Sequence, residues 1–216
     1  MKTDYQIQQD VLAELKWEPK VNSAHIGVEV KNGVVTLSGH VDNFAEKWSA
    51  EEAAKRVSGV RTLAIELDVV LPGSSKKTDS DIAQAANEAL KWNVYHLADK
   101  VSIRVEDGFI TLSGEVAWNY EKLSAAGSVR YLTGVRGVYN NITLKPAVSI
   151  NTVKFDIERA LKRRAHEEAQ EITVDIHGDE VILGGKIHDW KEKSLAIDAV
   201  WAIPGVKRVV DNTSFV

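Results

Sequence analysis

The stretch NGVVTLSGHV at residues 32–41 decides the fold, because it occurs three times along the chain. A close copy, DGFITLSGEV, occupies residues 107–116, and a more divergent copy, GDEVILGGKI, occupies residues 178–187. The copies are offset by 75 and then 71 positions, and a further glycine follows each motif glycine by 20 positions. A repeat of this length indicates tandem copies of one small domain.

Each copy of the motif predicts a hairpin. The dipeptides at its start tolerate positive φ and favour tight turns: Asn32-Gly33, Asp107-Gly108 and Gly178-Asp179. Apolar residues alternate on both sides, as in Ile26, Val28 and Val30 before the first turn and Val35, Leu37 and Val41 after it. A glycine falls on this apolar face in every copy, at Gly39, Gly114 and Gly185. We expect it to let a helix backbone approach the sheet closely.

Two helices are predicted around each hairpin. The first carries apolar residues at i, i+4 and i+8, which are Ile7, Val11 and Leu15, then Ile82, Ala86 and Leu90, then Val153, Ile157 and Leu161. We expect Asp4 and Asp79 to be the N-caps of the first two of these helices. A second helix runs from about residue 43 to 57, and the later glycines, Gly59, Gly134 and Gly205, are expected to cap its C-terminus in each copy.

A third strand follows in each copy, through Leu63, Ile65 and Leu67 in the first. The sequence therefore predicts an α+β fold of three tandem α-β-β-α-β modules, each with two helices packed on one face of a three-stranded mixed sheet. The predicted modules are residues 3–71, 78–146 and 151–216.

Composition excludes several classes of protein. The 216 residues contain no cysteine, which excludes disulfides, thiolate metal sites and cysteine nucleophiles. The net charge of −4 argues against nucleic-acid binding. The N-terminal stretch is amphipathic and unlike a signal peptide, and no stretch approaches 18 apolar residues. We therefore expect no transmembrane segment and a cytoplasmic location, or a periplasmic one if a leader has been removed.

The motif V-x-L-S-G after an N-G or D-G turn, with G-V some 20 residues later, resembles the BON family, named for bacterial OsmY and nodulation proteins. The resemblance covers nearly the whole chain, although the third copy has Gly184 where the first two have serine. It implies a small non-enzymatic module linked to the bacterial envelope and to osmotic or other stress. It also implies phospholipid binding, or potassium binding as in a cytoplasmic member of the family.

The sequence shows no catalytic constellation. It lacks the G-x-S-x-G, H-E-x-x-H and phosphate-loop motifs, and its six histidines include no i, i+4 pair. We therefore expect neither an enzyme nor a bound cofactor. A monovalent or divalent cation stays open as a ligand, because an ion held by backbone carbonyls leaves no side-chain signature.

Aromatic residues are the candidate contacts for a lipid or a protein partner. Trp17 and Trp92 occupy equivalent positions near the end of the first helix, whereas Phe44, Trp118, Tyr120 and Trp190 lie between the second strand and the second helix. Such side chains suit a membrane interface or a module contact, but they also suit the closing of small cores. A basic cluster, Arg159, Lys162, Arg163 and Arg164, is either a lipid contact or a solvated helix end.

The leading hypothesis is a non-enzymatic, stress-associated protein whose modules bind anionic phospholipid or an envelope partner. Charge favours the middle module, since residues 72–146 have 9 basic and 8 acidic side chains, whereas the flanking modules are acidic. A cytoplasmic protein that binds or senses potassium or another cation is one alternative. A chaperone-like scaffold that holds extended segments at its sheet edges is another.

Overall fold

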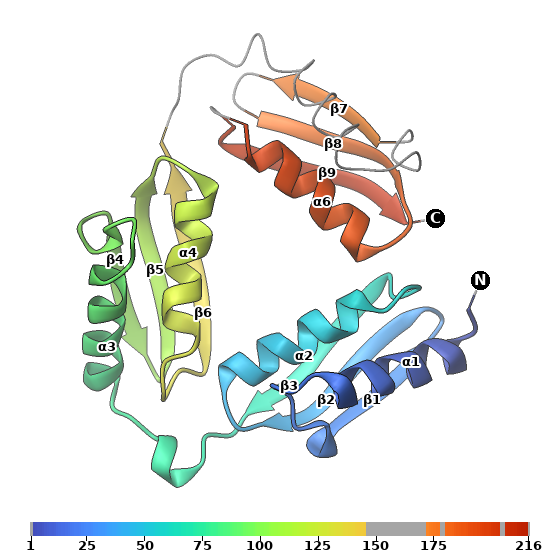
Figure 1. Ribbon diagram of the computed structural model, residues 1–216, viewed down its shortest axis with the longest axis horizontal. Helices are drawn as coiled ribbons and strands as arrows, with labels where there is room; N and C mark the ends of the chain where they lie inside the picture. Colours follow the sequence, from blue (N-terminus) through green and yellow to red (C-terminus); the bar gives the residue numbers. More distant parts are fainter. Residues whose placement is uncertain (1, 146–171, 178–179, 204–205, 216) are drawn as a thin grey trace. The chain divides into compact units, whose positions relative to one another are not determined.

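The computed structural model describes residues 2–145, 172–177, 180–203 and 206–215 (Figure 1). These residues form three separate sheets of three strands, one for each copy of the repeat. In the first and third sheets the middle strand pairs antiparallel with the strand before it and parallel with the strand after it. The predicted α+β fold of three tandem modules is therefore confirmed.

The first module contains α1 (Asp4–Trp17), β1 (Ile26–Lys31), β2 (Val34–Val41), α2 (Phe44–Arg56) and β3 (Thr62–Val69). A short 3-10 turn, η1 (Ser23–His25), leads into β1. Both helices cover the same face of the sheet (Figure 1). The other face of the sheet is left without a covering layer within this module.

The second module repeats this order with α3 (Asp79–Lys91), η3 (Leu97–Asp99), β4 (Val101–Glu106), β5 (Phe109–Val116), α4 (Asn119–Arg130) and β6 (Gly137–Leu144). A short turn, η2 (Gly73–Ser75), lies in the linker before it. The third module contains β7 (Ile172–His177), β8 (Glu180–Ile187), α6 (Trp190–Trp201) and β9 (Arg208–Phe215). The predicted first helix of the third copy, its basic cluster, the Gly178-Asp179 turn and Gly205 all lie outside the described residues.

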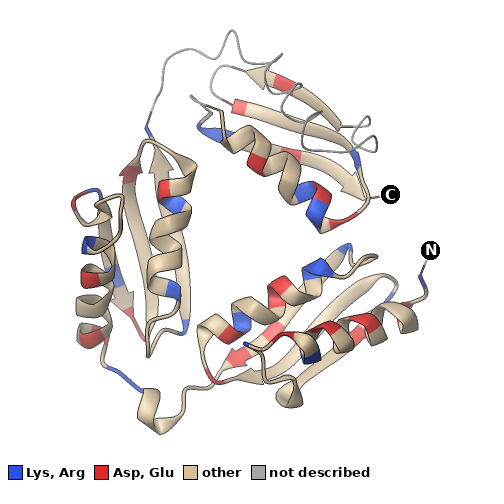
Figure 2. Cartoon of the chain, viewed as in Figure 1, with Lys and Arg blue, Asp and Glu red and all other residues tan. Residues whose placement is uncertain are grey.

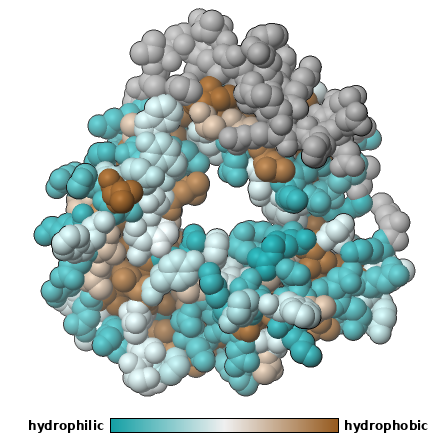
Figure 3. Space-filling view, in the orientation of Figure 1, coloured by the Kyte–Doolittle hydropathy of each residue, from teal (hydrophilic) through white to brown (hydrophobic). Residues whose placement is uncertain are grey.

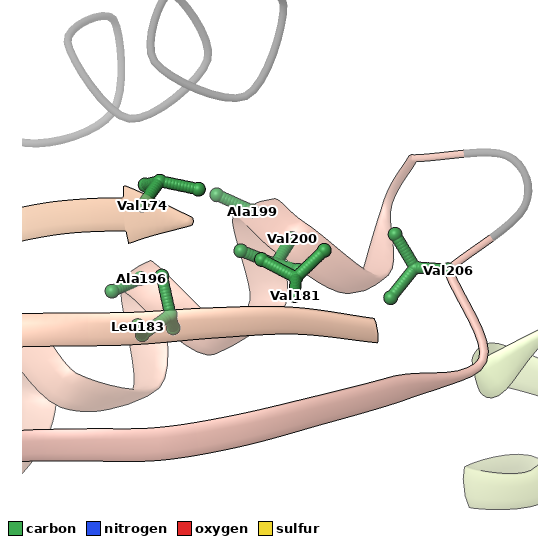
Figure 4. Close-up of a cluster of buried hydrophobic side chains, with 7 residues drawn as sticks. All are labelled: Val174, Val181, Leu183, Ala196, Ala199, Val200 and Val206. Atoms are coloured by element: carbon green, nitrogen blue, oxygen red, sulfur yellow. The ribbon is translucent and has the colours of Figure 1, made fainter. Parts of the chain in front are cut away.

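Alternating strand residues and small helix residues build each core. Figure 4 shows the core of the third module, in which α6 lies against the sheet through Ala196, Ala199 and Val200. The first module repeats the arrangement, since Val35 and Leu37 of β2 and Ala53 of α2 are fully buried. Alanines bring the helix close to the sheet, which explains why the second helix of the repeat is rich in small residues.

The predicted N-caps of the first helices are displaced by one residue. Thr3 caps α1 and Thr78 caps α3, each through a side-chain oxygen that accepts from a backbone N–H of the first turn. Asp4 instead accepts hydrogen bonds from the backbone of the hairpin turn, at 2.8 Å from Asn32 N and 3.1 Å from Gly33 N. Asp79 makes the same two bonds in the second module. The aspartate thus joins the helix start to the hairpin.

The predicted reason for the motif glycine is also wrong. A Cβ on Gly39 would lie 2.1 Å from the carbonyl oxygen of His25, so the backbone that approaches closely is the turn before β1 and not α2. Gly39 also has a φ of 118°, which other residues rarely adopt. Gly114 and Gly185 likewise have positive φ. Gly59 lies two residues beyond Val57, the C-cap of α2, and belongs to the following turn.

Candidate functional site

The aromatic residues singled out by the sequence divide into exposed and packed groups. Trp17, the last residue of α1, is 83% exposed, and Trp92, directly after α3, is 87% exposed. The other tryptophans of the set, Trp118 and Trp190, are partly buried, as is Phe44. The interpretation that aromatic residues close small cores therefore fails for Trp17 and Trp92.

Trp190 packs within its own module. It is the first residue of α6, and its ring centroid lies 5.4 Å from that of Phe215 at the end of β9. The ammonium of Lys193 lies 5.2 Å from the centroid of the Trp190 ring. This residue stabilises the third module and offers little surface to a ligand.

Tyr120 is exposed on the second module and lies beside a second exposed tyrosine. Its ring centroid is 5.0 Å from that of Tyr95, which belongs to the loop between α3 and η3. Leu123 follows Tyr120 one helical turn later on α4 and is also exposed. We name the exposed apolar residues at the end of α3, in the loop after it and at the start of α4 the helix-end surface: Trp92, Val94, Tyr95, Tyr120 and Leu123. Sequence reasoning missed Val94, Tyr95 and Leu123, although the run WNVY after a helix was a visible signal.

Asn93 fixes the loop that carries this surface. Its side-chain amide donates to the hydroxyls of Ser124 and Ser128 on α4, both at 2.8 Å. Its side-chain oxygen accepts from the backbone N–H of Tyr95 at 3.0 Å. His96 then adopts a φ of 49°, a left-handed conformation that few residues other than glycine adopt. The loop is therefore held in one geometry, with Trp92 and Val94 directed away from the core.

The first module holds the equivalent loop differently. Arg56 of α2 donates to the carboxylate of Glu14 at 2.9 Å and to that of Glu18 at 2.7 Å. The hydrogen bond from Arg56 holds the pKa of Glu18 below its usual value. Trp17 is exposed beside this clamp, but Lys20 stands where the second module has Tyr95. The first module therefore presents a smaller apolar group.

A Glu-Lys pair recurs at the start of the second helix in every module, at residues 46–47, 121–122 and 192–193. Sequence reasoning missed it, although the offsets of 75 and 71 would have revealed it. The Glu46 carboxylate accepts from the backbone N–H groups of Asn22 and Asp42 at 2.7 and 3.0 Å. Glu121 is buried and is bonded by Lys100 at 2.7 Å. Burial lowers the pKa of the neighbouring Lys122.

Surface charge is mixed over the described residues. Figure 2 shows acidic and basic side chains interspersed along the helices of each module. Figure 3 shows hydrophobic residues interrupting an otherwise largely hydrophilic surface. Within the part of the chain that the structure describes, no group of three or more His, Asp or Glu side chains is arranged to hold a metal ion. No helix in that part is long and apolar enough to cross a membrane.

The chain is similar to a curated protein of known name. Osmotically-inducible protein Y of Escherichia coli (strain K12) is 30% identical over 146 residues, which cover 66% of this chain and 73% of that protein. Among solved structures, the type III secretion protein CdsD of Chlamydia trachomatis aligns over 96% of this chain and 91% of its own, with 16% identity and a TM-score of 0.28. The periplasmic domain of PrgH aligns over 96% and 99%, with 11% identity and a TM-score of 0.23. TM-scores this low do not indicate a shared fold.

The BON domain matches three segments of the sequence, residues 3–70, 78–146 and 150–216. Each segment contains one of the three sheets. Together the segments span nearly the whole chain, and the chain therefore belongs to the BON domain family, with three tandem BON domains.

Proposed function

We propose that this chain is a non-enzymatic, stress-associated protein that binds anionic phospholipid through the helix-end surface of its second module. The observation that carries the proposal is Trp92, 87% exposed on a loop that Asn93 fixes against α4. The Trp92 ring buries little surface against its own module, which leaves most of it accessible to a ligand and supports the proposal.

The chemistry of the helix-end surface suits a membrane interface. Trp and Tyr rings are amphipathic and are enriched at the level of the lipid headgroups. Because the loop is already ordered by Asn93, binding loses little conformational entropy. Lys91, the last residue of α3, is exposed beside Trp92, and a basic residue near an anionic surface contributes about 1 kcal/mol.

The association with stress is supported by similarity alone. The matched protein of Escherichia coli is described as osmotically inducible, and the segment shared with it covers two thirds of this chain. A lipid-binding role also agrees with the mixed surface charge, because the middle module, unlike its neighbours, is not acidic overall.

Co-sedimentation of the full chain with liposomes tests the proposal. Vesicles of phosphatidylcholine alone and vesicles that also contain phosphatidylglycerol are compared at low and at high salt. We expect binding to the anionic vesicles at low salt and weaker binding at high salt, since salt screens the electrostatic part of the attraction. An absence of binding at low salt, where attraction is strongest, rejects the lipid proposal.

A further inference from the structure

The outer face of the second sheet carries a second exposed aromatic group. Phe109 of β5 and Tyr139 of β6 point away from the helices, with ring centroids 5.9 Å apart and planes inclined by 19°. Tyr139 is 57% exposed. With Arg104, Glu106 and Arg136, these residues form what we name the sheet-face cluster.

Gly137 and Arg136 hold the Phe109 ring against the sheet. A Cβ on Gly137 would lie 2.6 Å from a carbon of the Phe109 ring, so the ring occupies the space that any larger residue would fill. The guanidinium of Arg136 lies 5.7 Å from the centroid of the same ring, within reach of a cation–π interaction. The aromatic pair is therefore positioned by the fold.

Charge within the sheet-face cluster is mixed, because Arg104 and Glu106 form a pair and Arg136 lies over the Phe109 ring. Arg104 bonds the carboxylate of Glu106 at 2.7 Å, and both side chains are largely exposed. A surface that recognises nucleic acid or an anionic membrane requires basic residues free to meet phosphates. A surface with both signs side by side suits a partner with the same pattern, and aromatic residues and arginine are enriched at protein interfaces.

The sheet-face cluster is not part of the repeat. At the positions of Phe109 and Tyr139, the first module has Val34 and Ala64, and the third has Glu180 and Val210. The first and third modules form a three-stranded sheet of the same order without these rings. The fold therefore does not require an aromatic pair on this face.

We propose that a second copy of this chain docks on the sheet-face cluster, with the two sheet faces opposed about a two-fold axis. Glu106 pairs with Phe109 across the strands, and Arg104 pairs with Thr111 in the next outward row. A two-fold axis that lies between the two sheets, runs across the strands and passes between these rows places Arg104 opposite Glu106 of the second copy. Because the Phe109 ring lies over Gly137, two positions before Tyr139 on β6, the same axis brings Tyr139 towards the Phe109 ring of the second copy.

The size of the face sets the strength of this contact. Three strands about 4.8 Å apart, two of them about 26 Å long and β4 about 20 Å long, present roughly 350 Å² per copy. This area is less than half of the roughly 800 Å² per partner that stable complexes bury. The dimer is therefore weak and forms only at high protein concentration.

Sedimentation equilibrium of the full chain, from about 5 to 500 μM, tests the proposal in the range where weak interfaces associate. The average mass of the wild type should rise from 23.8 kDa towards twice that value. Tyr139→Ala should remain near the monomer mass, whereas Trp92→Ala should associate like the wild type. Circular dichroism confirms that both variants are folded.

A charge exchange tests the geometry. Arg104→Glu and Glu106→Arg should each weaken association at least tenfold, and the double variant should restore it, because the opposed pair is then re-formed. A wild type that stays monomeric at every concentration overturns the proposal, as does a dimer unaffected by Tyr139→Ala. A monomer that binds single-stranded oligonucleotide through Tyr139 also overturns it. Liposome binding does not depend on any of these outcomes.

Discussion

The carboxylate of Asp4 accepts a hydrogen bond from the backbone N–H of Gly33, 3.1 Å away, and so joins the start of α1 to the hairpin turn. A second bond, from the N–H of Asn32, completes the contact. Each hydrogen bond to a charged group contributes about 1.5 to 3 kcal/mol to the stability of a folded protein. This contact is long-range in sequence and connects the two signals by which the repeat is recognised, the helix start and the N-G turn.

Replacing Asp4 should destabilise the first module. We expect Asp4→Ala to lower the free energy of unfolding of this module by about 3 kcal/mol, the lower limit for two bonds to a charged group, because both bonds are at least partly exposed. Urea titration followed by NMR signals of the first module measures the change. Asp10→Ala is the control, because Asp10 takes part in an exposed ion pair with Lys2 and should change stability by less than about 1 kcal/mol. Equal effects of the two variants would contradict this role.

Replacement by alanine should reduce stability to very different extents at the two glycines of the stretch NGVVTLSGHV, residues 32–41. Gly33→Ala places a Cβ in open space, and we expect the positive φ of 77° to reduce stability by about 1 to 2 kcal/mol. Gly39→Ala adds a contact of 2.1 Å with the His25 carbonyl oxygen, and we expect a loss of at least about 3 kcal/mol. Thermal unfolding of the two variants checks the order. A Gly39→Ala protein as stable as Gly33→Ala would show that the turn before β1 can move away.

Asp211 should make the third module sensitive to acid. Burial alone would raise the pKa of Asp211, but the hydrogen bonds from Lys193 and Thr213 outweigh it and lower the pKa. The lowered pKa means that Asp211 stabilises the fold above its unfolded pKa of about 3.9, and that this stability is lost as pH falls through the folded pKa. Lys193 lies 2.5 Å from Asp211, and both are mostly buried.

The acid sensitivity of the third module is tested by urea unfolding of the wild type and of Asp211→Asn, at pH 7 and near pH 3. At pH 7 the variant should be less stable by about 1 to 3 kcal/mol, because Lys193 is left without its charged partner. The difference should shrink at the lower pH. A difference that stays constant between the two pH values would show that the ion pair does not titrate with folding.

The fold can be predicted from local sequence signals that repeat along the chain. The contacts between elements cannot be predicted from such signals. The turn dipeptides and the alternation of Val35 and Leu37 predict the hairpin from neighbouring residues alone. The cap of α1 was misplaced because Thr3 and Asp4 are adjacent and both are suitable caps. The choice between them depends on the hairpin turn some 28 residues away, which competes for the Asp4 carboxylate.

The candidate site was predicted only in part, because it also depends on contacts between elements that are distant in sequence. Trp92 and Trp190 are the same residue type, and the sequence gives no sign that Phe215 packs against Trp190 while Trp92 is left in solvent. Tyr95 escaped notice because it is not at a repeated position, and its link to Tyr120 arises from the Asn93 contact with α4. Residues that differ between copies thus required the three-dimensional structure.

The central claim, that the helix-end surface binds anionic lipid, is tested most directly by comparing two exposed aromatic residues of the same module. Affinity for vesicles with phosphatidylglycerol is measured by co-sedimentation for wild type, Trp92→Ala and Tyr139→Ala, at one low salt concentration. We predict at least a tenfold loss of affinity for Trp92→Ala, since a buried tryptophan ring contributes more than about 1.4 kcal/mol. Tyr139→Ala should bind like the wild type. Equal binding by Trp92→Ala and the wild type would contradict the claim.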